Sequence, residues 1–326
     1  MRHILGVDIG GTNIVVGAVA EDGSRVLGVR SEPTRPEEGA DAVMKRIGRL
    51  CRDSMADAER EGGVKAAKIA GVGIGSPGPL DRKQGMVLIT PNLGWRDFPL
   101  RQRVSDELGG LPAQLDNDAN CAVYGEWWLG AGRGAKYLIG LTIGTGIGGG
   151  IVVDGKLYHG TSDAAGEFGH TTINTTGRRC KCGNYGCLEA YASGPAIARR
   201  AVEAIEAGQT SKLPDYVDGA LEKITAQTVY QAAHDGDELA EEVVGDTAKF
   251  LGAGIANMIN IFNPEIVVVF GGVTYAGERL FGPLRREVAK RAFKPAVAVC
   301  RILPAELTGT AGVYGAARTF IDQTRG

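Results

Sequence analysis

The sequence predicts an α/β protein built from two related halves. Three observations indicate this fold class: apolar strand-like runs alternate with amphipathic helical stripes, a strand–glycine turn–strand pattern occurs twice, and 50 glycines gather at the ends of apolar runs. The 326 residues, with 44% hydrophobic and 23% charged side chains, are enough for about two domains with cores of their own.

The repeated pattern is the first organising feature of the chain. Residues 4–9 turn through Gly10, Gly11, Thr12 and Asn13 into a second apolar run at 14–19. Residues 138–143 turn in the same way through Gly144, Thr145 and Gly146 and reach a second run at 149–153. Two such units predict a duplicated domain with a cleft between its halves.

Each glycine turn can direct backbone N–H groups to one point, and Thr12 and Thr145 add hydroxyl donors. We therefore expect both turns to bind phosphate. Asp8 ends the first strand and would face that phosphate, where a carboxylate is tolerable if Mg²⁺ or its waters lie between them. The alternative is that Asp8 only caps the turn.

Two further glycine patterns match G-x-G-x-x-G, at 73–78 and 144–149. Neither is expected to open a helix, since the first runs into two prolines and the second into a strand-like run. No G-x-x-x-x-G-K-[ST] loop occurs. The sequence therefore predicts a nucleotide site made of two hairpin turns and not a dinucleotide-binding fold.

A polar cluster, Asp116-Asn117-Asp118-Ala119-Asn120, follows a short apolar lead-in and precedes an apolar stretch at 122–129. This order predicts a strand and then a helix. A carboxylate at such a junction stays ionised and can accept a proton from a substrate hydroxyl, which makes Asp118 the candidate base. Equally, Asp116 or Asp118 could cap a helix that begins near Ala119, and Asn117 carries the same ambiguity.

The remaining elements are predicted from periodicity. Helical stripes at 43–51 and 243–258 indicate core-facing helices, 266–270 is a buried strand, and 310–321 is a final helix. Gly271 and Gly272 follow the buried strand and would let adenine approach the backbone, although a plain turn explains them as well.

Four zinc-ligand side chains lie close together in the sequence: His170, Cys180, Cys182 and Cys187. Three thiolates and one imidazole complete a tetrahedral set, which favours a structural Zn²⁺ because no coordination position is left for a reacting water. Gly183 and Gly186 allow the tight loop that this requires. The alternative is a set of free buried thiols or a disulfide.

Composition excludes several function classes. A formal charge of −2 and a pI near 6.2 show no excess of basic residues of the kind that binds nucleic acid. The most apolar region, 250–270, is interrupted by asparagines, Pro264 and Glu265, so no membrane span is expected. Cys51, Cys121 and Cys300 lie far apart in expected core segments, and no signal peptide precedes the first strand, so we expect a cytoplasmic protein.

Over nearly its whole length the chain resembles the ROK family of sugar kinases and repressors. The resemblance rests on Asp8-Ile9-Gly10-Gly11-Thr12, on Asn117-Asp118-Ala119-Asn120, on residues 141–170 and, most specifically, on the cysteine motif at 180–189. It implies an actin-like ATPase (ribonuclease H-like) fold of two lobes with a cleft. We place the smaller lobe at 1–117 plus 312–326 and the larger, zinc-carrying lobe at 118–311.

The resemblance also implies roles for individual residues. Asp118 looks like the base that deprotonates the sugar hydroxyl, and His170 is implied to place one ring nitrogen on zinc and the other toward the sugar. The implied sugar-binding residues are Asn92, Asn117, Asp118, Glu167, His170 and Glu189. The implied ATP-binding residues are Asp8, Gly10, Gly11, Thr12, Asn13, Gly144, Thr145, Gly146, Gly271 and Gly272.

Within the family the motifs at 91–95 and 166–171 look most like bacterial ATP-dependent glucokinases. The implied reaction transfers phosphate from ATP, with Mg²⁺, to the 6-hydroxyl of a hexose, with glucose preferred. N-acetylmannosamine, fructose or another hexose remain alternatives, as does polyphosphate as donor, although such relatives usually lack the cysteine motif. A sugar-sensing repressor is the remote alternative, since the first strand at Ile4 leaves no room for a preceding helix-turn-helix. A homo-oligomer, dimer or tetramer, is expected.

Overall fold

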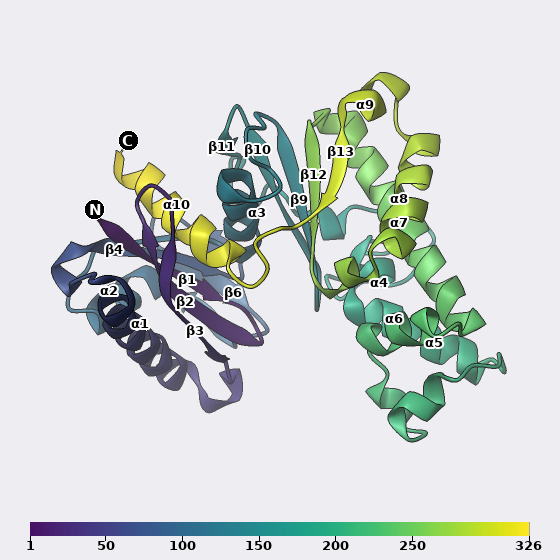
Figure 1. The fold of residues 1–326 in the computed structure, drawn as a ribbon. Coiled ribbons are helices and arrows are strands. Elements are labelled where there is room, and N and C mark those ends of the chain that lie inside the picture. The colour runs from purple at the N-terminus through teal and green to yellow at the C-terminus, as the bar shows by residue number, and fades with distance from the viewer. Residues whose placement is uncertain (326) are drawn as a thin grey trace. The chain divides into compact units, whose positions relative to one another are not determined.

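The computed structural model describes residues 1–325, and the chain divides into two compact units (Figure 1). Unit 1 comprises Met1–Lys136, Gly150–Gly166 and the segment that begins at Ala305, whereas unit 2 comprises Tyr137–Gly149 and Glu167–Pro304. The division differs from the predicted lobe boundary after Asn117. The reason is that the helix following Asn117 packs closely on the C-terminal helix and on the first sheet, so it belongs to unit 1.

Unit 1 is built on a five-stranded sheet of order β3-β2-β1-β4-β8. β1 pairs antiparallel with β2 and parallel with β4, and β4 pairs parallel with β8. A three-stranded sheet, β5-β6-β7, accompanies it. The strands are β1 His3–Ile9, β2 Asn13–Ala20, β3 Val26–Pro33, β4 Ile69–Ser76, β5 Leu80–Asp81, β6 Met86–Thr90, β7 Trp95–Phe98 and β8 Ala113–Asn117. The helices are α1 Ala40–Gly62, α2 Leu100–Glu107, α3 Asp118–Leu129 and α10 Ala311–Arg325.

The second sheet has the same kind of order, β11-β10-β9-β12-β13, with β9, β12 and β13 parallel. Its strands are β9 Leu138–Ile143, β10 Ile147–Val153, β11 Lys156–Leu157, β12 Ile266–Phe270 and β13 Arg301–Pro304. The helices of unit 2 are α4 Glu189–Ala192, α5 Gly194–Glu206, α6 Ala226–His234, α7 Glu238–Phe262, α8 Glu278–Arg291 and α9 Lys294–Val299. The matching orders agree with the duplication that the two glycine turns predicted.

Alternation along β1 explains how the first sheet is covered on both faces. Leu5, Val7 and Ile9 point into one core with residues of α1 and α2, while Ile4 packs on the other face with residues of α10. Figure 1 shows α10 and α1 beside this sheet. Gly6 shares the α10 face: a Cβ there would lie 2.1 Å from the carbonyl oxygen of Val313. On β4, a Cβ at Gly73 would lie 1.8 Å from the carbonyl oxygen of Ala316. The glycines therefore let α10 lie directly on the strands.

The predicted elements are confirmed with small shifts at their ends. β9 and β12 begin and end where the sequence predicts, whereas α10 continues to Arg325, beyond the predicted end at Ile321. Neither G-x-G-x-x-G match opens a helix, since the second leads directly into β10. Cys51 and Cys121 are fully buried, but Cys300 is half-buried between α9 and the edge strand β13, which corrects its placement in the core. Among the described helices, none is long and apolar enough to cross a membrane.

Candidate active site

The predicted site residues fall into two groups, one in each unit. Unit 1 holds Asp8, the 10–13 turn, Asn92, Asn117 and Asp118, and unit 2 holds the 144–146 turn, Glu167, His170, Glu189, the three cysteines, Gly271 and Gly272.

The first glycine turn is a tight and exposed hairpin between β1 and β2. The N–H of Gly10 donates to the carbonyl of Asn13 at 2.8 Å, and the Thr34 hydroxyl donates to the carbonyl of Gly10 at 2.7 Å. These bonds use the Gly10 N–H within the turn, while Gly11, Thr12 and Asn13 are exposed to solvent. An incoming anion would therefore meet the tip of the turn rather than Gly10.

Asn92, between β6 and β7, lies beside this turn. A Cβ at Gly11 would be in van der Waals contact with the Cβ of Asn92, at 3.5 Å, and both residues are exposed. The N–H of Leu93 donates to the hydroxyl and carbonyl of Thr90, which fixes the loop that carries Asn92.

Asp8 is the last residue but one of β1, and its side chain lies on the α10 face. Burial and the negative charge of nearby Asp118 raise the pKa of Asp8 to about 7. A Cβ at Gly312, at the start of α10, would lie 2.2 Å from Oδ2 of Asp8, so the glycine makes room for this carboxylate. Two half-buried carboxylates whose negative charges act on each other favour a cation nearby.

The structure resolves the capping ambiguity at the start of α3. Asn117 is the N-cap, since its Oδ1 accepts the N–H of Asn120 at 3.1 Å. Asp118 is the first helical residue, is partly exposed, and accepts the N–H of Ala119 through Oδ1 at 2.9 Å. Its Cα lies 3.4 Å from where a Cβ of Gly75 would stand. Asp118 is therefore at a helix N-terminus, where the macrodipole favours the ionised carboxylate.

The second glycine turn also follows the first strand of its sheet, but its closing hydrogen bond spans one residue fewer than that of the first turn. The N–H of Gly144 donates to the carbonyl of Gly146 at 2.9 Å, and Gly144 and Thr145 are exposed. Because β9 and β12 are parallel neighbours, Gly271 follows β12 at the same edge, and a Cβ there would lie 1.9 Å from the carbonyl oxygen of Ile143. Gly271 also has φ of 102°, which favours glycine, whereas Gly272 has open space beside it.

The four predicted metal ligands come together. The ligand atoms of His170, Cys180, Cys182 and Cys187 all lie within 4.8 Å of one another. The Sγ atoms of Cys182 and Cys187 are 3.7 Å apart, and Nδ1 of His170 is 3.9 Å from Sγ of Cys180. Ligands around a tetrahedral Zn²⁺ with Zn–S bonds of about 2.3 Å are separated by about 3.8 Å, so this donor set fits zinc. The separation of Cys182 and Cys187 excludes a disulfide between them.

Of the residues of unit 2 predicted to hold sugar hydroxyls, His170 belongs to this cluster, and Glu167 and Glu189 lie beside it. Nδ1 of His170 faces Cys180, and its Nε2 lies 3.9 Å from Oε2 of Glu167. Glu189 places Oε1 3.9 Å from Sγ of Cys180 and accepts the N–H of Ile147 through Oε2 at 2.9 Å. The ring of His170 therefore has one nitrogen toward the thiols and the other toward a carboxylate and solvent.

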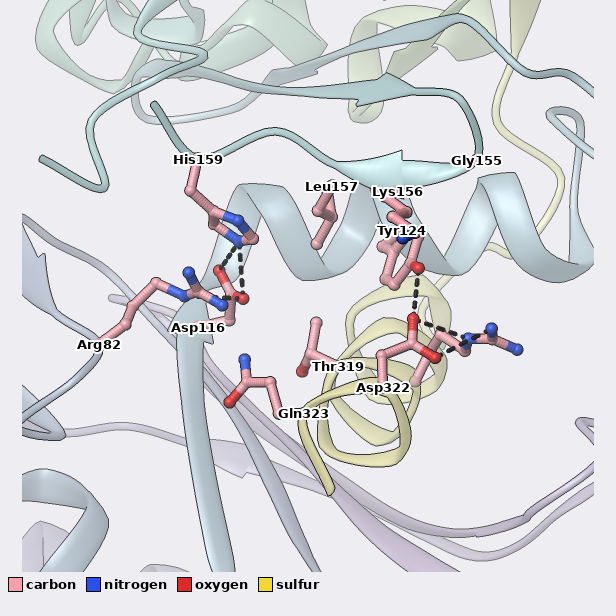
Figure 2. A pocket seen from close by; sticks show the side chains of 11 residues that line it. Arg82, Asp116, Tyr124, Gly155, Lys156, Leu157, His159, Thr319, Asp322 and Gln323 are labelled. Atoms are coloured by element: carbon pink, nitrogen blue, oxygen red, sulfur yellow. Dashed lines mark hydrogen bonds and ion pairs between the residues drawn. The ribbon is translucent and has the colours of Figure 1, made fainter. Parts of the chain in front are cut away.

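Three residues near the site were not predicted from the sequence. Arg82 and His159 both contact the buried carboxylate of Asp116, two residues before Asp118, and they line a pocket of about 420 Å³ (Figure 2). Gly312 packs against Asp8. A signal for His159 existed, because the chain has only four histidines. Arg82 and Gly312 carry no local sequence signal.

Two sheets of matching order, each with a glycine turn at the end of its first strand, define the actin-like ATPase fold. The ROK family pattern matches residues 4–323, and the chain belongs to the ROK family.

Three relatives illustrate the similarity. The chain is 38% identical to the glucokinase of Thermotoga maritima, over 99% of this chain and 98% of that protein. The crystal structure of a ROK family glucokinase from Streptomyces griseus, in complex with glucose and AMPPNP, superposes with a TM-score of 0.83 at 36% identity and covers 97% of this chain and 98% of that one. The xylose repressor of Bacillus subtilis is 32% identical over 78% of this chain and 62% of the repressor.

Proposed function

We propose that this protein is an ATP-dependent glucokinase that transfers the γ-phosphoryl group of ATP to the 6-hydroxyl of glucose. The observation that carries the proposal is Asp118, a partly exposed carboxylate at a helix N-terminus near half-buried Asp8, in a chain related over nearly its full length to glucokinases. The bound glucose and AMPPNP of the Streptomyces griseus relative support the same pair of substrates. The product, glucose 6-phosphate, would enter glycolysis.

Asp118 accepts the proton of the sugar 6-hydroxyl as that oxygen attacks phosphorus. The carboxylate is ready for this role because the helix N-terminus stabilises its charged form. Asn92, Asn117, Glu167, His170 and Glu189 offer acceptors and donors to the remaining sugar hydroxyls. Phosphoryl transfer depends mainly on alignment and charge neutralisation, so these contacts orient the hydroxyl for in-line attack.

ATP is assigned to the two glycine turns, 10–13 and 144–146, with Gly271 and Gly272 beside the adenine. Exposed Thr12 and Thr145 supply hydroxyl donors to phosphate oxygens. Asp8 would hold Mg²⁺, directly or through water, and the unusual pKa of this carboxylate supports a cation there. When bound, Mg²⁺ neutralises charge on the transferred phosphate.

His170, Cys180, Cys182 and Cys187 would hold a structural Zn²⁺. Its closed coordination leaves it no part in the chemistry, and the protein's use of it is to orient the His170 ring. Thiolate ligands require reduced cysteines, which supports a cytoplasmic location.

The decisive experiment is a coupled assay of the wild type and Asp118→Asn with ATP and a panel of glucose, mannose, N-acetylmannosamine, fructose and allose. We expect glucose to give the highest kcat/KM, and Asp118→Asn to lose about 10²–10⁴ in kcat while it still binds an ATP analogue. If another sugar gave a higher kcat/KM than glucose, the assignment as a kinase would stand and the preferred substrate would be that sugar. Retention of more than about a tenth of wild-type kcat by Asp118→Asn would remove Asp118 as the base.

A sugar-sensing repressor is the second candidate, because repressors are among the relatives. Electrophoretic mobility shift with promoter DNA, with and without sugar, separates the two, since a kinase without a DNA-binding role gives no shift.

We also propose self-association through unit 2. Ile261 at the end of α7, Phe293 and Val299 at the two ends of α9 are 72%, 70% and 60% exposed, and the N–H of Phe293 donates to Asn260, which places these elements side by side. Exposed large apolar side chains of this kind favour burial between copies. Light scattering of the wild type and Phe293→Glu tests whether a dimer or tetramer forms and depends on this surface.

A further inference from the structure

The carboxylate of Asp116 is completely buried and carries an unusual number of contacts. Its Oδ2 accepts from Nε of Arg82 at 3.1 Å, and Nε2 of His159 lies 3.0 Å from Oδ2 and 3.2 Å from Oδ1. Because a carboxylate only accepts, Nε2 of His159 carries the hydrogen. Two donors from separate loops therefore fix the plane of one buried carboxylate, as Figure 2 shows.

The same carboxylate holds the backbone that leads to the proposed base. Oδ1 of Asp116 accepts the N–H of Asn117 at 2.9 Å and lies 3.5 Å from Nδ2 of Asn120. Asn117 in turn caps α3, and Asp118 is the first residue of that helix. The orientation of Asp116 therefore sets the start of α3 and, through it, the position of Asp118.

The donors are themselves held in place. Nη1 of Arg82 lies 3.3 Å from Oδ1 of Asp163, and the N–H of Arg82 donates to Oδ2 of Asp163 at 3.4 Å. The carbonyl of His159 accepts the N–H of Ala165. A buried carboxylate with well-ordered partners on both oxygens is rigid, and loss of one partner leaves charge uncompensated.

We propose that Arg82 and His159 are positioning residues for phosphoryl transfer, and that they act through Asp116 on Asn117 and Asp118 without touching substrate. The proposal rests on the role of Asp118 as the base. Displacement of a catalytic group by about 1 Å can cost about 10²-fold in rate, so a loosened Asp116 should appear in kcat. None of the hydrogen bonds described for this network involves the 10–13 turn, so we expect KM for ATP to stay unchanged.

The pocket beside the network makes a specific test feasible. Its volume is about 420 Å³, and it is lined by His159, Arg82, Tyr124 and residues of β11 and α10 (Figure 2). The His159 side chain is 17% exposed, so a small molecule can reach the space that the ring would leave. In His159→Ala we expect kcat to fall about 10–100-fold with KM for ATP within about twofold. Added imidazole should then raise kcat at least about fivefold, since it can donate to Asp116.

The matched controls are the wild type and Tyr124→Phe. Tyr124 lines the same pocket but bonds Asp322 and not Asp116, so neither protein should respond to imidazole. Arg82→Met and Arg82→Lys provide an independent pair of variants. We expect Arg82→Met to lower kcat as His159→Ala does. Arg82→Lys should keep a kcat between those of Arg82→Met and the wild type, because its ammonium group keeps the positive charge but not the fork geometry of the guanidinium. Circular dichroism and thermal unfolding of every variant give the folded fraction, and kcat is expressed per folded molecule.

Imidazole rescue of His159→Ala, or loss in Arg82→Met with recovery in Arg82→Lys, supports the positioning role. The role is overturned if both His159→Ala and Arg82→Met keep kcat within about twofold of wild type, or if neither imidazole nor Lys restores any activity. Asp118→Asn measured in parallel separates the two proposals. If Asp118→Asn is active, Asp118 is not the base. If Asp118→Asn is inactive while the Arg82 and His159 variants keep wild-type kcat, only the positioning role is refuted.

Discussion

Glu189 joins the metal loop to the second glycine turn: its Oε2 accepts the N–H of Ile147 at 2.9 Å, while its Oε1 lies 3.9 Å from Sγ of Cys180. A Cβ at Gly146 would be only 2.5 Å from that same Oε2, so the turn and the carboxylate are in direct contact. The residue assigned to a sugar hydroxyl thus also supports the turn assigned to phosphate.

This double contact predicts different effects for two substitutions at one position. Glu189→Gln keeps an acceptor for Ile147 and should raise KM for glucose about tenfold or more while KM for ATP stays within about twofold. Glu189→Ala removes the acceptor and should raise both constants. Steady-state kinetics with each substrate varied measures them, and an unchanged KM for ATP in Glu189→Ala would show that the bond to Ile147 does not support the turn.

Removal of zinc should weaken sugar binding. Zinc fixes the ring of His170, and Cys187 anchors the chain two residues before Glu189, so chelation or Cys182→Ser should weaken glucose binding about 10–100-fold and lower the Tm. Calorimetric titration of glucose into protein of measured zinc content tests this, with Cys300→Ser, outside the ligand set, as the matched thiol control. Equal glucose affinity with and without zinc, in folded protein, would show that the zinc site stabilises the loop but does not affect sugar binding.

Stability should depend on pH through Asp8. The folded pKa of Asp8, about 7, is above its unfolded value of about 3.9, so ionisation opposes folding. The stability that the protonated form provides is present below about pH 4 and is lost as the pH rises through 7. The free energy of unfolding of Asp8→Asn, relative to that of the wild type, should therefore increase over this pH range, by about 1–3 kcal/mol at pH 8.

Urea unfolding from pH 5 to 8, without Mg²⁺, gives this difference directly. Asp53→Asn, on the exposed surface of α1, is the control and should show no such trend. A constant difference between Asp8→Asn and wild type over the range would contradict the proposed burial of charge at Asp8.

Gly312→Ala should displace the Asp8 carboxylate, because Gly312 at the start of α10 lies directly against it. The new Cβ would lie 2.2 Å from Oδ2 of Asp8, so the carboxylate must rotate away, and we expect kcat to fall about tenfold with KM for glucose unchanged. Gly245→Ala in α7 has open space around the new Cβ and should stabilise its helix by up to about 1 kcal/mol without affecting kcat. Wild-type kcat in Gly312→Ala would show that the position of Asp8 is not critical.

Local features of the site followed from the sequence. Strand–glycine turn–strand patterns predicted β1 to β2 and β9 to β10, because alternating burial and glycine conformations are encoded by neighbouring residues. The four ligands around 170–187 were predicted for the same reason, since a short loop brings its own residues together. The start of α3 was predicted to within a residue, but the choice of cap was not.

The tertiary structure decided what depends on contacts between distant segments. Asn117 rather than Asp118 is the cap, and the N–H of Asn117 is bound by Asp116, which is held by Arg82 and His159, 34 and 43 residues away in the sequence. The placement of α3 with unit 1 reflects its close packing on α10, where a Cβ at Gly125 of α3 would lie 2.1 Å from the carbonyl oxygen of Ala311. Composition and periodicity determine which residues form strands, turns and a metal loop. Which side chain meets the buried charge of Asp116, or makes room for Asp8, is set only when segments far apart in the chain pack together.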